Sequence, residues 1–273
     1  MKRTLLVLGM VLALAMTAMA STAMESSGAE IISPTAGEVV YENTLYLEAK
    51  SGDDESVNVA VRTTTPGDDN CSLRGETVIY RDVSGKLRTD DAGIYSESID
   101  ISTAEAGLYC FAFDPADAPR ISVKFYIVDH YVKAGGVVDA TAFDLDFEKR
   151  GNGTHAFEGW AADAGSSAGI LGEFTLNYRA GEECTYTPGE LSITTSVTNP
   201  ADDLVRVVLK DWDSTAGCER NDIRLLESNA NEFFPRGGIY TPGELDTGIS
   251  SPPNPAVDFW VPLTHGNVHI YSR

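Results

Sequence analysis

The sequence has few basic residues, and this shortage restricts the partners that the protein binds. Its 273 residues include 41 Asp and Glu but only 20 Lys and Arg, which gives a net charge of −21. Lys is especially scarce, with seven residues against 22 Asp. Nucleic acids and anionic membrane surfaces are bound by patches of Lys and Arg, so we exclude nucleic acid as a partner. The acidity indicates a solvated, soluble surface.

Long apolar runs are also missing, apart from one stretch near the start. Lys2 and Arg3 precede the apolar residues 5–16, and Ala18-Met19-Ala20 has the small-x-small pattern that signal peptidase recognises. The run is shorter than the roughly 18 residues that a membrane helix needs. We therefore predict a signal peptide at 1–20 and a flexible N-terminus at 21–29. The protein is expected to be secreted or on the cell surface, with no membrane insertion after cleavage.

Cysteine is scarce but even in number, which is typical of an exported protein with disulfides. The four residues are Cys71, Cys110, Cys184 and Cys218. Three connectivities are possible, and we favour Cys71–Cys110 with Cys184–Cys218, because each pair then lies within one expected domain. No CxxC spacing is present, which argues against a metal site built from these thiols.

The rest of the chain has the patterns of short β-strands. Residues 57–62 and 121–127 alternate apolar and polar side chains, which is the period of a half-buried strand. Similar runs separated by Gly, Pro, Asn and Asp lie at 39–47, 77–81, 95–101, 108–113, 142–147, 155–161, 172–178, 191–197, 204–210, 257–261 and 268–271. These runs predict an all-β protein. Residues 222–234 suit either one short helix or a further strand.

Residues 30–130 resemble the immunoglobulin-like β-sandwich modules of bacterial and archaeal surface proteins. The resemblance rests on the opening residues 32–37 with their Pro and Gly, on residues 95–113, and on a last strand that ends at Val128-Asp129. It implies an N-terminal immunoglobulin-like β-sandwich. In the antibody pattern Tyr stands two residues before Cys, whereas Tyr109 is adjacent to Cys110. Neighbours in a strand face opposite sides, so we expect no tyrosine corner here.

Residues 131–273 form the second expected domain, a β-rich sandwich or barrel that begins near Gly135-Gly136. The region has a limited similarity to post-COAP-type accessory β domains of secreted bacterial proteins. That similarity rests on the Gly pair, on residues 211–222 and on the ending at 265–270.

The segment from Asp211 to Asp222 has the oxygen spacing of a calcium-binding loop. The oxygen-bearing side chains at positions 1, 3, 5, 9 and 12 of this segment are Asp211, Asp213, Thr215, Glu219 and Asp222. EF-hand loops have this spacing, because Ca²⁺ takes six to eight oxygen ligands from a tight loop. Position 6 is Ala216 instead of Gly, and Asp222 is shorter than the usual Glu, so an acidic hairpin loop is the alternative. Ca²⁺ is the one cofactor that the sequence suggests.

Catalytic patterns occur only in unsuitable surroundings. Gly165, Ser167 and Gly169 match the G-x-S-x-G pattern of serine hydrolases, and His265 and His269 follow, but a parallel sheet with crossover helices is not expected. The residues Trp160, Trp212, Phe259 and Trp260 are candidates for an aromatic carbohydrate platform. We expect a non-enzymatic protein with an adhesion, envelope-architecture or ligand-binding role, whose partner is an extracellular protein or glycan. An extracellular enzyme, or the carbohydrate-binding accessory module of one, is the alternative.

Overall fold

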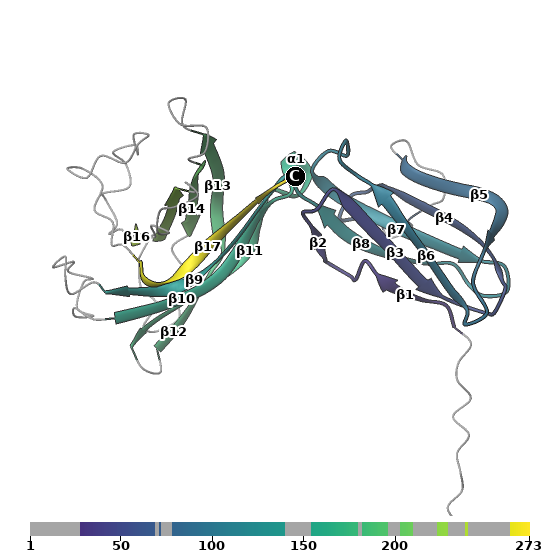
Figure 1. Cartoon of the computed structure of the whole chain (residues 1–273), viewed down its shortest axis with the longest axis horizontal. Coiled ribbons are helices and arrows are strands. Elements are labelled where there is room, and N and C mark those ends of the chain that lie inside the picture. Colours follow the sequence, from purple (N-terminus) through teal and green to yellow (C-terminus); the bar gives the residue numbers. More distant parts are fainter. Residues whose placement is uncertain are drawn as a thin grey trace, which may run out of the picture.

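The computed structural model describes residues 28–68, 71, 78–139, 154–179, 182–195, 203–209, 223–228, 238–239 and 263–273. Within these ranges the chain is almost entirely β-structure, which confirms the all-β prediction. The strands form two groups, one ending at residue 127 and one starting at residue 130, and each group makes two sheets (Figure 1). In this described part, no helix is long and apolar enough to cross a membrane.

The first group forms a three-stranded and a five-stranded sheet, with orders β1-β3-β6 and β2-β8-β7-β4-β5. The strands are β1 (Glu30–Ser33), β2 (Val39–Val40), β3 (Thr44–Lys50), β4 (Ser56–Thr63), β5 (Val78–Arg88), β6 (Ile94–Asp100), β7 (Gly107–Pro115) and β8 (Ile121–Ile127). Strand β2 runs parallel to β8, whereas the other pairs described in these two sheets are antiparallel. The predicted strand 39–47 is therefore two strands, one in each sheet.

The two sheets of the first group enclose one apolar core. The alternation seen in the sequence directs Val57, Val59 and Val61 into this core, and none of the three has exposed surface. Phe111 and Phe125 are equally buried and come from neighbouring strands of the five-stranded sheet. Burial of one such side chain contributes about 1.5–3 kcal/mol. This half of the chain is a β-sandwich held by side chains from both sheets.

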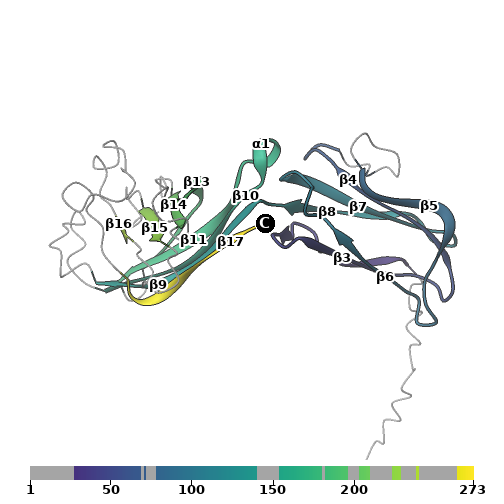
Figure 2. The same ribbon diagram turned by 45° about the horizontal axis from the view of Figure 1, so that its top comes forward.

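The second group also forms two sheets, with orders β12-β11-β10-β9-β17 and β13-β14-β15-β16. Its elements are β9 (His130–Asp139), β10 (Thr154–Asp163), α1 (Gly165–Ala168), β11 (Ile170–Arg179), β12 (Glu182–Tyr186), β13 (Pro188–Thr195), β14 (Asp203–Leu209), β15 (Ile223–Ser228), β16 (Gly238–Ile239) and β17 (Leu263–Ser272). The four-stranded sheet lies over one face of the five-stranded sheet (Figure 2). Phe157, Ala161 and Phe174 of the five-stranded sheet are buried, as are Val205 and Val207 of the four-stranded sheet, and β13 contacts β10 and β11. Of the two forms expected for this region, the described strands make the sandwich.

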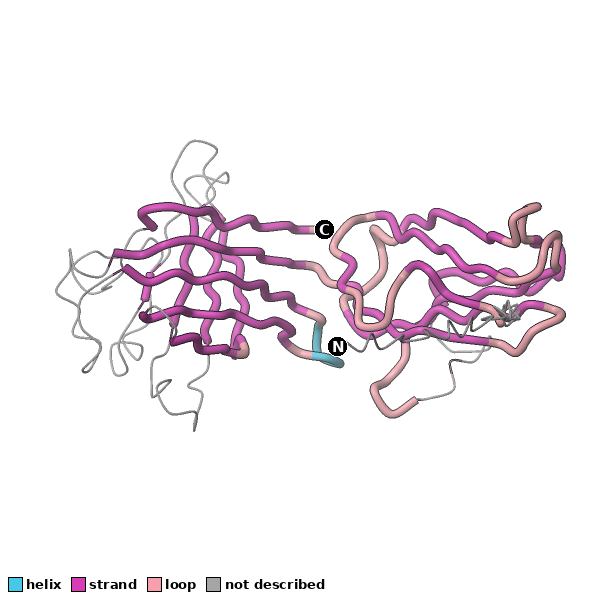
Figure 3. The backbone as a smooth tube through the Cα atoms, turned by 90° about the horizontal axis from the view of Figure 1, so that it is seen from below, coloured by secondary structure: helices cyan, strands magenta, loops and turns pink. Residues whose placement is uncertain are grey.

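The two halves meet at a junction that Arg273 occupies (Figure 3). Its side chain is 3% exposed. The guanidinium donates hydrogen bonds to the carbonyl oxygens of Ile101, Ala104 (2.6 Å) and Val128 (3.2 Å), and it pairs with the Asp129 carboxylate at 2.5 Å. The Arg273 N–H also donates to the Asp129 carbonyl at 2.9 Å. Arg273 thus ties the end of β17 to loops of the first sandwich.

Helix α1 lies at the same junction, where it follows β10 and approaches β7. Gly165 begins the helix with a φ of +70°, and a Cβ atom there would lie 2.6 Å from the Ala106 carbonyl oxygen. Only glycine fits both the left-handed backbone and this close approach. Buried Val128, Ala162 and Ala164 fill the space beneath the helix. The junction is therefore closely packed.

Two expectations from the sequence need correction here. Tyr109 and Cys110 do face opposite sides of β7, since Tyr109 belongs to the sandwich core and Cys110 to a separate buried cluster. However, the Tyr109 hydroxyl donates a hydrogen bond of 2.7 Å to the Glu105 carbonyl, four residues upstream. That is the bond of a tyrosine corner, so the expectation that none is present is wrong.

Gly135 and Gly136 were expected to mark where the second region starts, but they lie in the middle of β9. At this place β17 approaches β9 so closely that it requires glycine at Gly266, where a Cβ atom would lie 2.1 Å from the Gly135 carbonyl oxygen. Of the two alternatives for 222–234, the strand is found at Ile223–Ser228. The predicted strands at 142–147 and 257–261 lie outside the described residues.

A buried carboxylate connects several loops at one end of the first sandwich. Glu55 is 6% exposed and accepts hydrogen bonds from the backbone N–H groups of Gly52 (2.8 Å) and Asp117. Burial by itself would raise the pKa of Glu55, but these N–H groups stabilise the carboxylate and lower its pKa below the usual 4.5. The folded state therefore favours the ionised form of Glu55.

Candidate functional site

The five-stranded sheet of the second group has one face that no described strand covers. Residues of this face follow the alternation of the strands, so their neighbours in sequence point into the core. We call this surface the aromatic face; it consists of Tyr131 and Lys133 on β9, Glu158 and Trp160 on β10, Glu173 and Thr175 on β11, Glu183 on β12, and His269 and Tyr271 on β17. The pairing of the strands places aromatic and charged side chains side by side.

Aromatic rings form a continuous row along one end of this face. Tyr131 is stacked on Trp160, with ring centroids 5.9 Å apart and planes 21° apart. On its other side Tyr131 stacks on Tyr41 at 4.5 Å, and Tyr41 belongs to the first sandwich. Tyr271 contacts both tyrosines, and His269 lies 6.3 Å from Tyr271. The row therefore crosses the junction and continues onto the sheet.

Charged groups surround the exposed part of the row. Lys133 on β9 pairs with Trp160 on β10 and with His269 on β17. Glu173 on β11 pairs with Trp160 from the side opposite Lys133. Lys133, Glu158 and Glu173 are exposed, whereas Trp160 is partly buried. These side chains line a hollow of about 630 Å³, a volume within the range of about 300–1,000 Å³ found for small-molecule sites. The arrangement can stack a ring and hydrogen-bond the groups around it.

Two glycines shape the sheet at this point. A Cβ atom on Gly135 would contact Glu158 at ordinary distance. Because Gly135 has no side chain, the aromatic face is lower at this position. On Gly159 a Cβ atom would lie 2.3 Å from the Glu173 carbonyl oxygen and 2.5 Å from a ring carbon of Phe174. Gly159 thus lets the core side of β10 lie tightly against β11. The sheet is fixed beneath Trp160.

Burial of the row has an electrostatic effect on Tyr131. Loss of solvent raises the pKa of the Tyr131 hydroxyl, and the nearby Tyr41 and Tyr271 hydroxyls raise the pKa further. The raised pKa favours the neutral form of the Tyr131 hydroxyl, and the Tyr131 ring provides a stacking surface. This role suits binding more than proton transfer.

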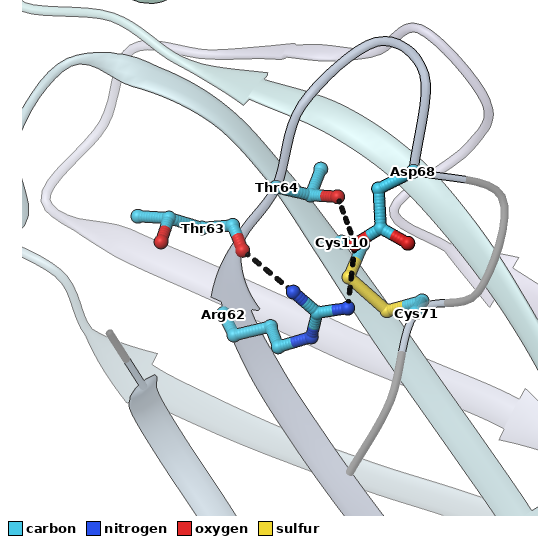
Figure 4. Close-up of a disulfide and its surroundings, with 6 residues drawn as sticks. All are labelled: Arg62, Thr63, Thr64, Asp68, Cys71 and Cys110. Atoms are coloured by element: carbon cyan, nitrogen blue, oxygen red, sulfur yellow. Dashed lines mark hydrogen bonds and ion pairs between the residues drawn. A yellow bond between two sulfur atoms is a disulfide. The ribbon is translucent and has the colours of Figure 1, made fainter. Parts of the chain in front are cut away.

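The first disulfide predicted from the sequence is present, and it covers the outer face of the first sandwich (Figure 4). Cys71 and Cys110 are bonded, and they are 39 positions apart in the sequence. Beside them Arg62 pairs with Asp68 at 2.8 Å, and its side chain is 10% exposed. The Thr64 hydroxyl donates a hydrogen bond to the same carboxylate at 3.2 Å. The group fastens a loop to the sheet and has the character of a structural clasp.

The second predicted disulfide and the predicted calcium loop fall wholly or partly outside the described residues. Cys184 lies on β12, but Cys218 is outside the described residues, so the Cys184–Cys218 bond stays a prediction. Also outside the described residues are the aromatics Trp212, Phe259 and Trp260 and the calcium loop with Asp211, Asp213, Thr215, Glu219 and Asp222. The calcium site therefore stays a prediction. Among the residues that are described, no three His, Cys, Asp or Glu side chains gather as metal ligands.

The serine-hydrolase pattern forms a single helical turn between antiparallel strands. Gly165, Ser167 and Gly169 lie at α1, next to the first sandwich, and Ser167 is exposed. His265 and His269 lie on β17 and are both exposed. The strand–helix sequence belongs to an antiparallel sheet, which differs from the parallel sheet of the hydrolase elbow. The pattern therefore carries no catalytic assignment.

Sequence reasoning found Trp160 and missed its neighbours. Tyr131, Lys133, Glu158 and Glu173 come from three strands, and only their register brings them together. The alternation of Tyr131-Val132-Lys133-Ala134 was a usable local signal, because it predicts that Tyr131 and Lys133 share one face. Comparison with protein-family models, curated proteins and solved structures finds no match to this chain.

Proposed function

We propose that this is a secreted or cell-surface binding protein without catalytic activity of its own, which serves adhesion, envelope architecture or ligand capture. The observation that carries this proposal is the aromatic face. It combines stacked rings with exposed charged groups on a broad sheet. Catalytic carboxyls usually lie in an enclosed cleft, whereas Glu158 and Glu173 are exposed on an open surface. An open surface of this kind favours binding.

The first sandwich supports the same proposal, since we propose that residues 30–130 are an immunoglobulin-like module. Its strand orders, with β2 parallel to β8 and a tyrosine-corner bond at Tyr109, are in keeping with such a module. In this arrangement the first sandwich acts as a spacer, and the Arg273 junction holds the aromatic face in a fixed direction. Export by the signal peptide at 1–20 would place the face outside the cell.

The experiment asks whether the exported protein binds the envelope of cells that express it through the aromatic face. Labelled wild-type protein is compared with Trp160→Ala, and with Tyr46→Ala as the control. Tyr46 is 59% exposed on β3, and therefore tests loss of an exposed aromatic ring elsewhere. We expect export, and binding that falls at least tenfold in Trp160→Ala but not in Tyr46→Ala.

Retention of the protein in the cytoplasm would contradict the proposal. Equal binding by all three proteins would also contradict it, provided that Trp160→Ala remains folded. Because Trp160 is partly buried, a second variant with Glu158→Ala and Glu173→Ala repeats the comparison at exposed positions.

A further inference from the structure

We propose that the aromatic face binds a pyranose glycan that carries no acidic groups; this inference rests on the proposed binding function and names the ligand of that site. Three features of the face lead to it, namely the ring surfaces, the hydrogen-bonding groups around them and the sign of the local charge. Each feature restricts the chemistry of the ligand in a different way.

The rings select a ligand with a flat, weakly polar surface. Trp160 and Tyr131 are nearly parallel and both line the hollow. The face of an aromatic ring carries partial negative charge and attracts the partially positive hydrogens of a C–H group. A pyranose ring offers several C–H groups on one side and hydroxyls around its edge. It can therefore lie on Trp160 while its hydroxyls point outward.

The polar groups stand where the edge of such a sugar would lie. Glu158 lies two residues before Trp160 on β10, Glu173 pairs with Trp160 from β11, and Thr175 follows on the same face of β11. Carboxylates accept hydrogen bonds from hydroxyls, and Lys133 donates to hydroxyl or ring oxygens. Hydrogen bonds to charged groups are the stronger kind. The face thus combines apolar stacking with both acceptors and donors.

The charge of the face excludes acidic ligands. Of the described residues that line the hollow, Glu158 and Glu173 are acidic and exposed, and Lys133 is basic. The chain as a whole has a net charge of −21. A glycan with uronic acid, sialic acid, sulfate or phosphate groups would be repelled by this field. A neutral or amino-sugar glycan is not repelled.

The shape of the site favours a chain over a single sugar. The lining residues extend across four neighbouring strands, from β9 to β12. With strands spaced at about 4.8 Å, the site measures about 14 Å across. That width exceeds one ring, and the hollow is open toward solvent, so a polysaccharide can pass over it.

The test uses the full chain on a printed array of neutral, amino-sugar and uronate oligosaccharides. We expect signal on neutral or amino-sugar glycans and none on uronates. Trp160→Ala should abolish the signal, and Glu158→Ala with Glu173→Ala should weaken it at least tenfold. Tyr46→Ala should bind as the wild type does, and thermal melts identify any variant that is unfolded. If Trp160→Ala does not fold, the Glu158/Glu173 variant decides the question alone.

The proposal is overturned if no glycan retains the protein, if uronates bind equally well, or if the Glu158/Glu173 variant binds as tightly as the wild type. A second arm separates this result from the proposed function. A protease of broad specificity removes proteins and leaves glycans, so we expect binding to the cell envelope to survive protease treatment. Envelope binding that depends on the aromatic face but is lost after protease treatment would point to a protein ligand. In that case the binding function stands and the glycan inference fails.

Discussion

Replacement of Arg273 by alanine should separate the two halves of the molecule. The substitution removes the guanidinium bonds to three backbone carbonyls and to the Asp129 carboxylate, and it leaves the buried acceptors unpaired. Loss of one partner from a buried charged pair typically costs about 3–5 kcal/mol. Asp129 is 51% exposed, so solvent compensates part of its loss and we expect about 3 kcal/mol. Arg88→Ala is the matched control, because Arg88 pairs with Asp54 at 3.2 Å with both side chains exposed, and should cost less than about 1 kcal/mol.

The measurement uses the uneven distribution of tryptophan. All three Trp residues lie at or beyond position 160, so Trp fluorescence reports the second half, whereas far-UV circular dichroism reports both halves. In the wild type the two urea transitions should coincide. In Arg273→Ala the fluorescence transition should separate from the dichroism transition, since the junction no longer couples the halves. If Arg273→Ala costs no more than Arg88→Ala, or if its two transitions still coincide, the coupling through Arg273 is refuted.

Three further predictions concern the sheets and the loops. Gly159→Ala should destabilise the second half by about 1–3 kcal/mol because its Cβ atom would overlap β11. Gly67→Ala is the control, because a Cβ atom there has no other atom within 4 Å, and it should change stability by less than about 0.5 kcal/mol. Urea unfolding followed by fluorescence compares the two variants. Glu55 has a lowered pKa in the folded state, so its contribution to folding stability is complete above the usual pKa of 4.5 and is lost as the pH falls through the lower folded value. Glu55→Gln should therefore show a smaller loss of melting temperature between pH 6 and pH 3 than the wild type. An equal loss in both proteins would contradict this prediction. Thiol titration of the unfolded, non-reduced chain should find no reactive thiol, and two or more thiols per chain would disprove the two-disulfide assignment. Replacing Cys71 and Cys110 by alanine should lower the stability measured in thermal melts by about 4 kcal/mol, on the chain-entropy estimate for a 39-residue separation.

Local patterns were enough to predict the class of fold. The alternation in 57–62 and 121–127 matches the strands β4 and β8, because a half-buried strand must place every second side chain in the core. The same reasoning failed at Gly135-Gly136, which was interpreted as a boundary. There β17 passes close to β9, and the residue that this approach requires to be glycine, Gly266, lies far away in the sequence. A single stretch of sequence contains no information about such a distant neighbour.

The same limit explains what was missed at the candidate site. Trp160 stands out by its residue type, but Lys133 and Glu173 are ordinary surface residues until the register of β9, β10 and β11 sets them beside Trp160. Tyr41 comes from the other sandwich and joins the row only through the junction. The disulfide pair was easier to predict, since an even cysteine count and the domain division left few choices.

The pairing of β9 with β17 has a consequence for how the protein acquires its structure. Synthesis proceeds from the N-terminus, and the first sandwich has all its described strands once residue 127 is available. The second cannot complete its five-stranded sheet until residues 263–272 arrive beside β9, and until then β9 presents the unpaired backbone groups of an open edge. The first sandwich is thus able to fold during synthesis, whereas the second must wait for β17. Because Arg273 follows β17 directly, the junction closes only after β9 and β17 have paired, and the aromatic face gains its fixed direction at that step.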